Sequence, residues 1–328
     1  MRTIAIDRPG GPEVLVEREL PDPAPGRGEV LIEVAAAGVN RADLLQRQGF
    51  YPPPPGAPDT PGLECAGIIA AVGPEVEGWQ PGDRVAALLD GGGYASLALA
   101  PTGQLLRVPD ELDLVAAAAL PEALCTAWSN LVMVAGLAAG ETVLILGGSG
   151  GVGSIAIQLA AARGARVLAT AGGPERVARC VTLGAAVGID HRSQDVAAAV
   201  AEATEGRGAD VILDVLGAGA LDANLRSLAL GGRLVVIGLQ QGRRGELDLG
   251  LLMARRASIH GTTLRARPLA EKAAIVAEVA EQVWPLVGTS GDARIRPLVD
   301  AQLPLAQAGR AHELLAAGAV FGKVVLVP

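Results

Sequence analysis

The run Gly147-Gly-Ser-Gly-Gly-Val-Gly153 constrains the fold of this chain more than any other segment. An apolar stretch at 142–146 comes immediately before it, and an amphipathic segment that begins near Val152 follows it. A strand, a glycine turn and a helix in this order form the first unit of a parallel sheet covered by helices. We therefore expect an α/β fold with a doubly wound parallel sheet built around this turn.

The segments after the glycine run repeat the same alternation of short apolar stretches and helical stretches. The strand candidates lie at 142–146, 166–170, 186–189, 210–215, 233–237 and 258–264. Alternation of this kind predicts a parallel sheet that is covered on both faces.

Residues 1 to 110 have a different sequence pattern, with short strand candidates separated by turns that contain Pro and Gly. This pattern is typical of an antiparallel, barrel-like domain. After a helix expected at 269–286, the chain ends in short strands that resemble the first domain again. We therefore predict that 1–123 and 266–328 form one discontinuous domain and that 124–265 form the domain with the parallel sheet.

Composition and charge exclude several classes of protein. Half of the residues are hydrophobic and 19% are charged, so the 328-residue chain can bury a large core. The net charge of −8, without a basic stripe, argues against a nucleic-acid partner. No uninterrupted apolar segment approaches the roughly 20 residues that span a bilayer, so we expect no membrane partner and a cytoplasmic location.

The three cysteines, Cys65, Cys125 and Cys180, are far apart and include no Cys-x-x-Cys pair. This spacing indicates neither a disulfide framework nor a structural zinc site. We expect all three to be buried, reduced thiols.

The glycine run also predicts a ligand. Gly148, Gly150 and Gly153 satisfy the G-x-G-x-x-G spacing, which lets the backbone approach a pyrophosphate whose charge is stabilised by the helix start. The Ser149 hydroxyl can add a donor. The expected dinucleotide contacts in this loop are Gly148, Ser149, Gly150, Gly151, Val152 and Gly153.

A hydrolase is the alternative from another reaction class. Gly147-x-Ser149-x-Gly151 fits the nucleophile elbow of α/β-hydrolases, and Asp214 with His260 or His312 could complete a triad. This interpretation leaves the third glycine and the whole first domain unexplained.

The end of the second strand indicates which dinucleotide binds. An NAD site usually has an acidic residue here, but the sequence reads Thr170-Ala-Gly-Gly173, with Glu175 following. Arg176 could pair with a 2′-phosphate. We therefore expect NADPH, with Thr170, Gly172 and Arg176 beside its ribose phosphate.

The whole chain resembles the zinc-lacking, zeta-crystallin-like quinone oxidoreductases of the medium-chain dehydrogenase/reductase superfamily. It is most similar to the subgroup typified by the tumour-suppressor-induced quinone oxidoreductase. The resemblance rests on the segments at 37–56, 61–67 (Pro-Gly-Leu-Glu-Cys-Ala-Gly), 81–85 (Pro-Gly-Asp-Arg-Val) and 261–267 (Gly-Thr-Thr-Leu-Arg-Ala-Arg). It implies a GroES-like catalytic domain, a Rossmann domain, NADPH-dependent quinone reduction and a homodimer joined through edge strands near 258–264.

The resemblance also indicates a reaction without metal. Zinc alcohol dehydrogenases of this superfamily have Cys where this chain has Asn40, and a His before the Glu where this chain has Gly62-Leu63-Glu64. Without these ligands a tetrahedral zinc site cannot form.

Site residues follow from the resemblance. It places Asn40 and Tyr51 at the nicotinamide pocket, where an amide and a phenol could bond the acceptor oxygen. Asn40 fits equally well as a turn residue, and Tyr51 as an aromatic lid. His191 stands where relatives often have Tyr, and a protonated imidazole could bind the 2′-phosphate. The remaining expected cofactor contacts are Thr126, Leu216, Gly217, Ile237, Gly238, Thr263, Phe321 and Lys323.

Two further alternatives stay open at this stage. A reductase of enal or enone double bonds needs the same hydride geometry as a quinone reductase. A non-catalytic NADPH-binding protein would bind the cofactor without turnover. The sequence does not identify the natural acceptor, and it does not separate one-electron from two-electron reduction.

Overall fold

The computed structural model describes residues 1–289 and 294–328, which divide into two compact units. One unit comprises Met1–Cys125 with Leu264–Pro328, and the other comprises Thr126–Thr263. The predicted domain boundaries, 123/124 and 265/266, lie two residues before the first junction and two residues after the second.

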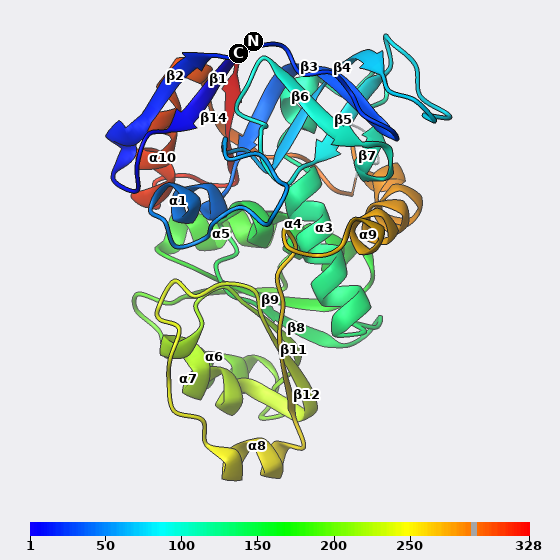
Figure 1. Ribbon diagram of the computed structural model, residues 1–328. Coiled ribbons are helices and arrows are strands. Elements are labelled where there is room, and N and C mark those ends of the chain that lie inside the picture. The colour runs from blue at the N-terminus through cyan, green and yellow to red at the C-terminus, as the bar shows by residue number, and fades with distance from the viewer. Residues whose placement is uncertain (290–293) are drawn as a thin grey trace. The chain divides into compact units, whose positions relative to one another are not determined.

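The Thr126–Thr263 unit contains a six-stranded parallel sheet in the order β10-β9-β8-β11-β12-β13 (Figure 1). The strands are β8 (Thr142–Ile145), β9 (Arg166–Ala171), β10 (Val187–Asp190), β11 (Ala209–Asp214), β12 (Leu228–Val236) and β13 (Ser258–Gly261). The predicted doubly wound sheet is therefore confirmed, and all six strand candidates contribute to it. The strand order reverses between β8 and β11, which is where open α/β sheets bind ligands.

Helices connect successive strands of this sheet. They are α4 (Gly151–Ala162), α5 (Pro174–Thr182), α6 (Val196–Ala203), α7 (Leu221–Ser227) and α8 (Leu249–Arg255). One apolar layer forms where Val200 of α6 and Leu225 of α7 pack against Leu144 and Ile212 of the sheet. The central strand β8 is buried along its whole length, because neighbouring strands flank it and helices cover it.

The other unit is built on a mostly antiparallel sheet in the order β14-β15-β3-β4-β5-β7, with β6 paired to β3. Its strands are β3 (Glu29–Val39), β4 (Glu64–Val72), β5 (Arg84–Leu88), β6 (Leu97–Pro101), β7 (Leu105–Arg107), β14 (Val299–Pro304) and β15 (Lys323–Val327). Strands β1 (Arg2–Ile6) and β2 (Leu15–Glu19) form a separate hairpin. The predicted antiparallel domain is confirmed. In the described part of the chain, its pairing follows this order without joining β14 to β7.

Alternating burial explains the position of β3 in this sheet. Val30, Ile32 and Val34 enter the core, whereas Glu33 between them is exposed. The helices of the unit are α1 (Arg41–Arg47), α2 (Leu114–Ala117), α9 (Leu269–Gln282) and α10 (Ala308–Ala316), and α3 (Pro121–Trp128) crosses the boundary between the units. Helix α9 ends earlier than predicted and a 3₁₀ turn follows at Trp284–Leu286, because Pro285 has no N–H to continue the α-helix.

One helical stretch bears on the sequence-based expectation about membrane spans. Leu114–Val134 is helical, 21 residues long and apolar enough to cross a bilayer, and 78% of its most apolar window is buried inside the protein. Burial of this kind is typical of a core helix. The three cysteines are buried and free, as predicted.

Candidate active site

The glycine turn joins β8 to α4, and the backbone holds it in place through Thr170 at the end of β9. Gly148 donates its N–H to the Thr170 carbonyl at 2.8 Å, and Gly147 donates to Thr170 Oγ1 at 3.1 Å. Helix α4 begins at Gly151 with no side-chain cap. Its first N–H groups therefore present the positive end of the helix dipole.

The glycines of the turn have different roles. A Cβ on Gly153 would stand 2.1 Å from the Gly147 carbonyl oxygen, and a Cβ on Gly148 would stand 3.1 Å from Cys180 Sγ. These two glycines are required by the protein's own packing. A Cβ on Gly150 would meet only the Gly147 oxygen, at 3.4 Å, so the backbone here is open to an approaching group. The turn therefore fits a pyrophosphate.

Arg192 is a functional candidate that sequence reasoning missed. A Cβ on Gly172 would stand 2.9 Å from Arg192 Nε, so the guanidinium lies against the turn that follows β9. Asp190 holds this arrangement, since its Oδ1 accepts from the N–H groups of Gly173 (2.9 Å) and Arg192 (3.0 Å). These backbone bonds lower the pKa of the Asp190 carboxyl. The signal available from sequence was a second cation two residues beyond the end of a strand.

The other predicted phosphate residues flank the same turn. Arg176 is half-buried in the first turn of α5, and His191 is exposed next to Arg192. Glu175, in the same turn of α5, is exposed. The turn therefore has two arginines and an exposed histidine around its glycine pair, and the Asp190 carboxylate is bonded to the Gly173 N–H.

The ends of β11 and β12 bring two further predicted segments together. A Cβ on Gly217 would stand 3.1 Å from the Gly238 carbonyl oxygen, and one on Gly238 would stand 2.6 Å from the Val215 carbonyl oxygen. Leu216-Gly217 and Ile237-Gly238 therefore lie side by side. The remaining predicted cofactor contacts differ in exposure: Thr126, Phe321 and Lys323 are buried, and Thr263 is exposed.

The hydrolase interpretation is not favoured. The Asp214 carboxylate accepts from the backbone N–H groups of Leu216 and Gly217, and His260 Nε2 bonds to Ser258 Oγ at 3.0 Å. Among the contacts of the described residues His260 makes no hydrogen bond to Asp214 or Ser149, whereas a triad requires such bonds. Both ring nitrogens of His312 have partners in its own unit, Arg47 and Tyr94.

In the antiparallel unit, Asn40 lies in a buried ionic network. Lys323 Nζ donates to Asn40 Oδ1 at 2.6 Å and forms an ion pair with the Glu64 carboxylate. Asn40 Nδ2 donates to Glu64 Oε1 at 2.8 Å, and the other Glu64 oxygen accepts from the Glu122 N–H at 2.9 Å. Lys323 is 4% exposed and Glu64 is fully buried. The Asn40 amide and the Lys323 ammonium are thus hydrogen-bonded to each other. The expected contact of Asn40 with the acceptor and that of Lys323 with the cofactor stay predictions.

A second hydrogen-bond chain starts at the same residue. The Asn40 N–H donates to Asp43 Oδ2 at 2.7 Å, and the Tyr94 hydroxyl donates to the same oxygen at 3.0 Å. His312 Nε2 lies 3.2 Å from the Tyr94 hydroxyl and Nδ1 lies 3.4 Å from Arg47 Nη1. Because Arg47 can only donate, neutral His312 carries its proton on Nε2. Burial raises the pKa of Asp43 to about 6 and lowers that of His312 to about 3.

Tyr51, the second predicted catalytic residue, lies beside a buried arginine. The Arg265 guanidinium carbon is 5.7 Å from the centroid of the Tyr51 ring, within the range of a cation–π contact. Burial raises the pKa of the Tyr51 phenol, and the Arg265 charge lowers it by a smaller amount. Sequence reasoning did not single out Arg265.

The described residues, 1–289 and 294–328, contain no group of three or more His, Cys, Asp or Glu side chains placed to hold a metal ion. The positive charge beside Glu64 belongs to Lys323. The residues around Asn40 therefore do not fit a zinc ion.

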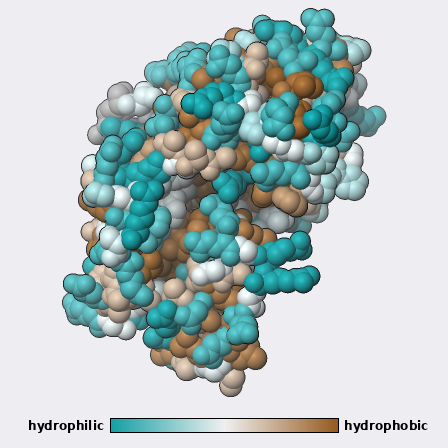
Figure 2. All heavy atoms as spheres, turned by 90° about the vertical axis from the view of Figure 1, so that its left-hand side faces the viewer, coloured by the Kyte–Doolittle hydropathy of each residue, from teal (hydrophilic) through white to brown (hydrophobic). Residues whose placement is uncertain are grey.

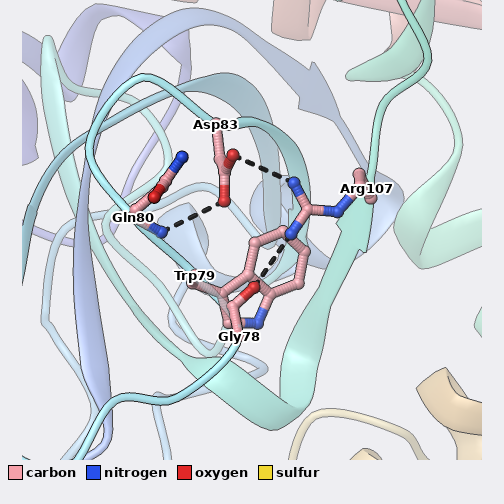
Figure 3. A pocket seen from close by; sticks show the side chains of 5 residues that line it. All are labelled: Gly78, Trp79, Gln80, Asp83 and Arg107. Atoms are coloured by element: carbon pink, nitrogen blue, oxygen red, sulfur yellow. Dashed lines mark hydrogen bonds and ion pairs between the residues drawn. The ribbon is translucent and has the colours of Figure 1, made fainter.

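A surface pocket of about 370 Å³ lies apart from these residues in the antiparallel unit (Figure 3). Arg107 stacks over the Trp79 ring at 4.4 Å, pairs with Asp83 at 3.0 Å and donates to the Gly78 carbonyl at 2.9 Å. Asp83 also accepts from the Gln80 N–H. Arg107 and Asp83 therefore balance each other's charge in this pocket.

Two family models match the chain. An alcohol dehydrogenase GroES-like domain matches residues 26–110, and a zinc-binding dehydrogenase domain matches residues 151–281. A quinone oxidoreductase from Lama guanicoe is 36% identical over 332 aligned residues, covering 100% of this chain and 97% of the relative. The chain belongs to the quinone oxidoreductase family of medium-chain dehydrogenases/reductases.

Other members of the quinone oxidoreductase family support this assignment. One from Pseudomonas aeruginosa is 35% identical over 320 residues, covering 97% of both chains. The crystal structure of the Escherichia coli quinone oxidoreductase complexed with NADPH covers 100% of both chains, with a TM-score of 0.87 and 29% identity. As a member of this family the protein is an oxidoreductase with a GroES-like and a Rossmann-type domain.

Proposed function

We propose that this quinone oxidoreductase family member catalyses NADPH-dependent, metal-independent reduction of quinones by hydride transfer. The observation that carries the proposal is similarity over the whole chain to quinone oxidoreductases, one of which is known as an NADPH complex. The proposal places the enzyme among the NAD(P)H dehydrogenases that use a quinone as acceptor.

The chain's own residues support NADPH as the cofactor. The uncapped start of α4 and the open backbone at Gly150 suit a pyrophosphate, and Arg176 and Arg192 suit a 2′-phosphate beside Gly172. When bound, NADPH supplies the hydride. The protein must hold the acceptor and stabilise the charge that develops on it.

The acceptor end of the site is assigned to the antiparallel unit. The Tyr51 hydroxyl keeps its proton at neutral pH, because burial raises its pKa, and it can donate to an acceptor oxygen. Asn40 is positioned by Lys323 and Glu64 and contributes a fixed amide. Solvent supplies the final proton.

The proposed setting is cytoplasmic, with a small-molecule electrophile as substrate and a second copy of the chain as partner. Strand β13 is the edge of its sheet, and nearby helix α8 exposes Leu249 (60%) and Met253 (75%). Figure 2 shows apolar side chains among polar ones at its lower end, where α8 lies in Figure 1. An edge strand with apolar neighbours can pair with a second copy. Sedimentation equilibrium tests this directly, and a monomer would contradict it.

The deciding experiment follows the absorbance of reduced nicotinamide with purified protein, a panel of quinones and a panel of enones. We expect turnover with quinones that prefers NADPH to NADH and resists a metal chelator. Turnover with enones alone would replace the proposal by double-bond reduction. Tight NADPH binding without any turnover would indicate a binding protein.

A further inference from the structure

We propose that Arg265 is a catalytic residue that binds the acceptor oxygen on which negative charge develops. This inference rests on the proposed function and deepens it, because it names the group that stabilises the product anion. It starts from an unusual feature of the antiparallel unit, a buried guanidinium with unused donor capacity.

Arg265 is 4% exposed, and its hydrogen bonds are to neutral backbone oxygens. Nε donates to the Asp90 carbonyl at 2.7 Å, and Nη1 lies 3.5 Å from the Tyr51 carbonyl oxygen. Nη2 is buried without a hydrogen-bond partner among the described residues. Among the described residues no carboxylate lies within ion-pair distance of this guanidinium. The Asp43 and Asp90 charges act on it from farther away, and the Asp90 carboxylate is paired with Lys272.

A buried charge in this condition is unfavourable for the folded protein. An unpaired buried donor costs about 1–3 kcal/mol and more when it is charged. Burial also lowers the pKa of Arg265. Arginine nevertheless stays protonated in proteins, so the cost is not relieved by losing the proton. A ligand with a negative oxygen would relieve it.

The position of Arg265 indicates which negative oxygen it binds. The guanidinium lies over the ring of Tyr51, whose hydroxyl is the second donor proposed for the acceptor. Asn40 shares its amide with Lys323 and Glu64, so it is the more constrained donor at the acceptor. Arg265 and Tyr51 therefore form the donor pair that is available to a developing oxyanion.

Access to Nη2 requires a small movement that the local sequence permits. Gly49 and Gly56 have φ values of 82° and 86°, and they flank a segment that Pro52, Pro53, Pro54 and Pro55 stiffen. Tyr51 within this segment is half-buried, and neighbouring Phe50 is 78% exposed. In the proposed step this stiff segment between two left-handed glycines swings as a unit to admit the acceptor and then returns Tyr51 to its place beside Arg265.

The chemical step balances without a further reactant. The acceptor gains two electrons and a hydrogen as hydride, and the reduced nicotinamide is oxidised. The hydride forms an O–H bond at one carbonyl oxygen of the quinone. Both C=O π bonds are lost as the ring becomes aromatic, and the electron pair reaches the other oxygen, to which Arg265 and Tyr51 donate hydrogen bonds. Arg265 keeps its proton throughout, and water later protonates the oxygen.

The test compares Arg265→Ala and Arg265→Lys with wild type, and uses Arg18→Ala as a control at an exposed arginine paired with Asp7. Loss of an oxyanion donor typically costs about 10²–10³ in kcat. We expect a fall of about 100-fold for Arg265→Ala, a smaller fall for Arg265→Lys, and an unchanged dissociation constant for NADPH. Guanidinium ion added to Arg265→Ala should restore part of the activity.

A series of substituted quinones supplies a second readout that a structural role would not move. Without Arg265 the acceptor must stabilise its own charge, so log kcat should depend more steeply on the acidity of the product hydroquinone in Arg265→Ala than in wild type. A folded Arg265→Ala enzyme within threefold of wild-type kcat, or with an unchanged slope, overturns the proposal. If the alanine variant does not fold, the slope measured for Arg265→Lys decides.

Binding of 4-nitrophenolate separates failure of this proposal from failure of the proposed function. If wild type reduces no quinone, the function proposal fails. Weaker phenolate binding by Arg265→Ala than by wild type would still support an anion site at Arg265, and equal binding would overturn it.

Discussion

Lys323 Nζ donates a hydrogen bond to Asn40 Oδ1 at 2.6 Å while it forms an ion pair with Glu64. The two residues of the hydrogen bond are 283 positions apart in sequence, and the bond fixes which way the amide faces. Oδ1 points to the ammonium, and Nδ2 points to the carboxylate. The side chain that the family resemblance places at the acceptor is therefore oriented by a buried cation.

Replacement of Lys323 by Met should destabilise the fold strongly. Breaking a buried ion pair by removing one partner costs about 3–5 kcal/mol, because the remaining charge is left uncompensated. Glu64 is fully buried, so water cannot compensate its charge. The measurement is the midpoint of urea-induced unfolding, and Lys323→Met with Glu64→Gln should recover part of the loss.

A matched control is Lys272→Met. Lys272 is 2% exposed, but its partner Asp90 is 21% exposed, so the orphaned carboxylate can be hydrated. We expect a smaller loss than for Lys323→Met. Equal losses for the two variants would show that the burial of Glu64 does not determine the cost of removing its partner.

Asp43 and His312 change stability with pH in opposite directions. Burial raises the pKa of Asp43 from 3.8 to about 6, so the stability that it contributes below pH 3.8 is lost as the pH rises toward 6. Burial, with the Arg47 charge, lowers the pKa of His312 from 6.5 to about 3, so its contribution is complete above pH 6.5 and is lost as the pH falls toward 3. Between about pH 4 and 6 the contributions of Asp43 and His312 to the free energy of unfolding change with pH in opposite directions.

Replacing either Asp43 or His312 should reveal the pH dependence that the other residue gives to the free energy of unfolding. Relative to wild type, the free energy of unfolding of His312→Gln should fall as pH rises, by up to about 1.4 kcal/mol per pH unit between about pH 4 and 6. Asp43→Asn should show the opposite slope in the same window. Urea unfolding at a series of pH values measures both, and profiles parallel to wild type would refute the assignment.

The glycine turn and the parallel sheet could be predicted from sequence, because local patterns encode them. Apolar stretches at 142–146 and 166–170 alternate with helices, and Gly153 must be glycine to approach Gly147. The partners of Asn40 could not be predicted, since Glu64 and Lys323 lie 24 and 283 positions away and meet only through strand pairing. Arg265 was missed for a related reason. Its unused donor is a property of the folded surroundings and has no signature in the chain.

Gly150 and Gly153 separate nucleotide binding from folding. In Gly153→Ala the new Cβ would stand 2.1 Å from the Gly147 oxygen, so we expect a lower melting temperature and loss of NADPH binding together. In Gly150→Ala the only contact is at 3.4 Å, so stability should stay near wild type while NADPH affinity falls at least about tenfold. Calorimetry of unfolding and of binding measures the two effects. An unchanged affinity of Gly150→Ala for NADPH would contradict binding of the pyrophosphate at this position.

Arg192 and Arg176 should set the preference for NADPH over NADH. Each can make a charge-assisted hydrogen bond to a 2′-phosphate, and such bonds contribute about 1.5–3 kcal/mol, or roughly tenfold to 100-fold in affinity. Arg192→Ala should raise the KM for NADPH in this range and leave that for NADH nearly unchanged, because NADH has no 2′-phosphate. Arg226→Ala, at an exposed arginine of α7 paired with Asp222, should change neither constant. Equal increases in the KM for NADPH and for NADH would show that Arg192 stabilises the turn at Gly172 and does not bind the 2′-phosphate. The preference for NADPH would then depend on Arg176 alone.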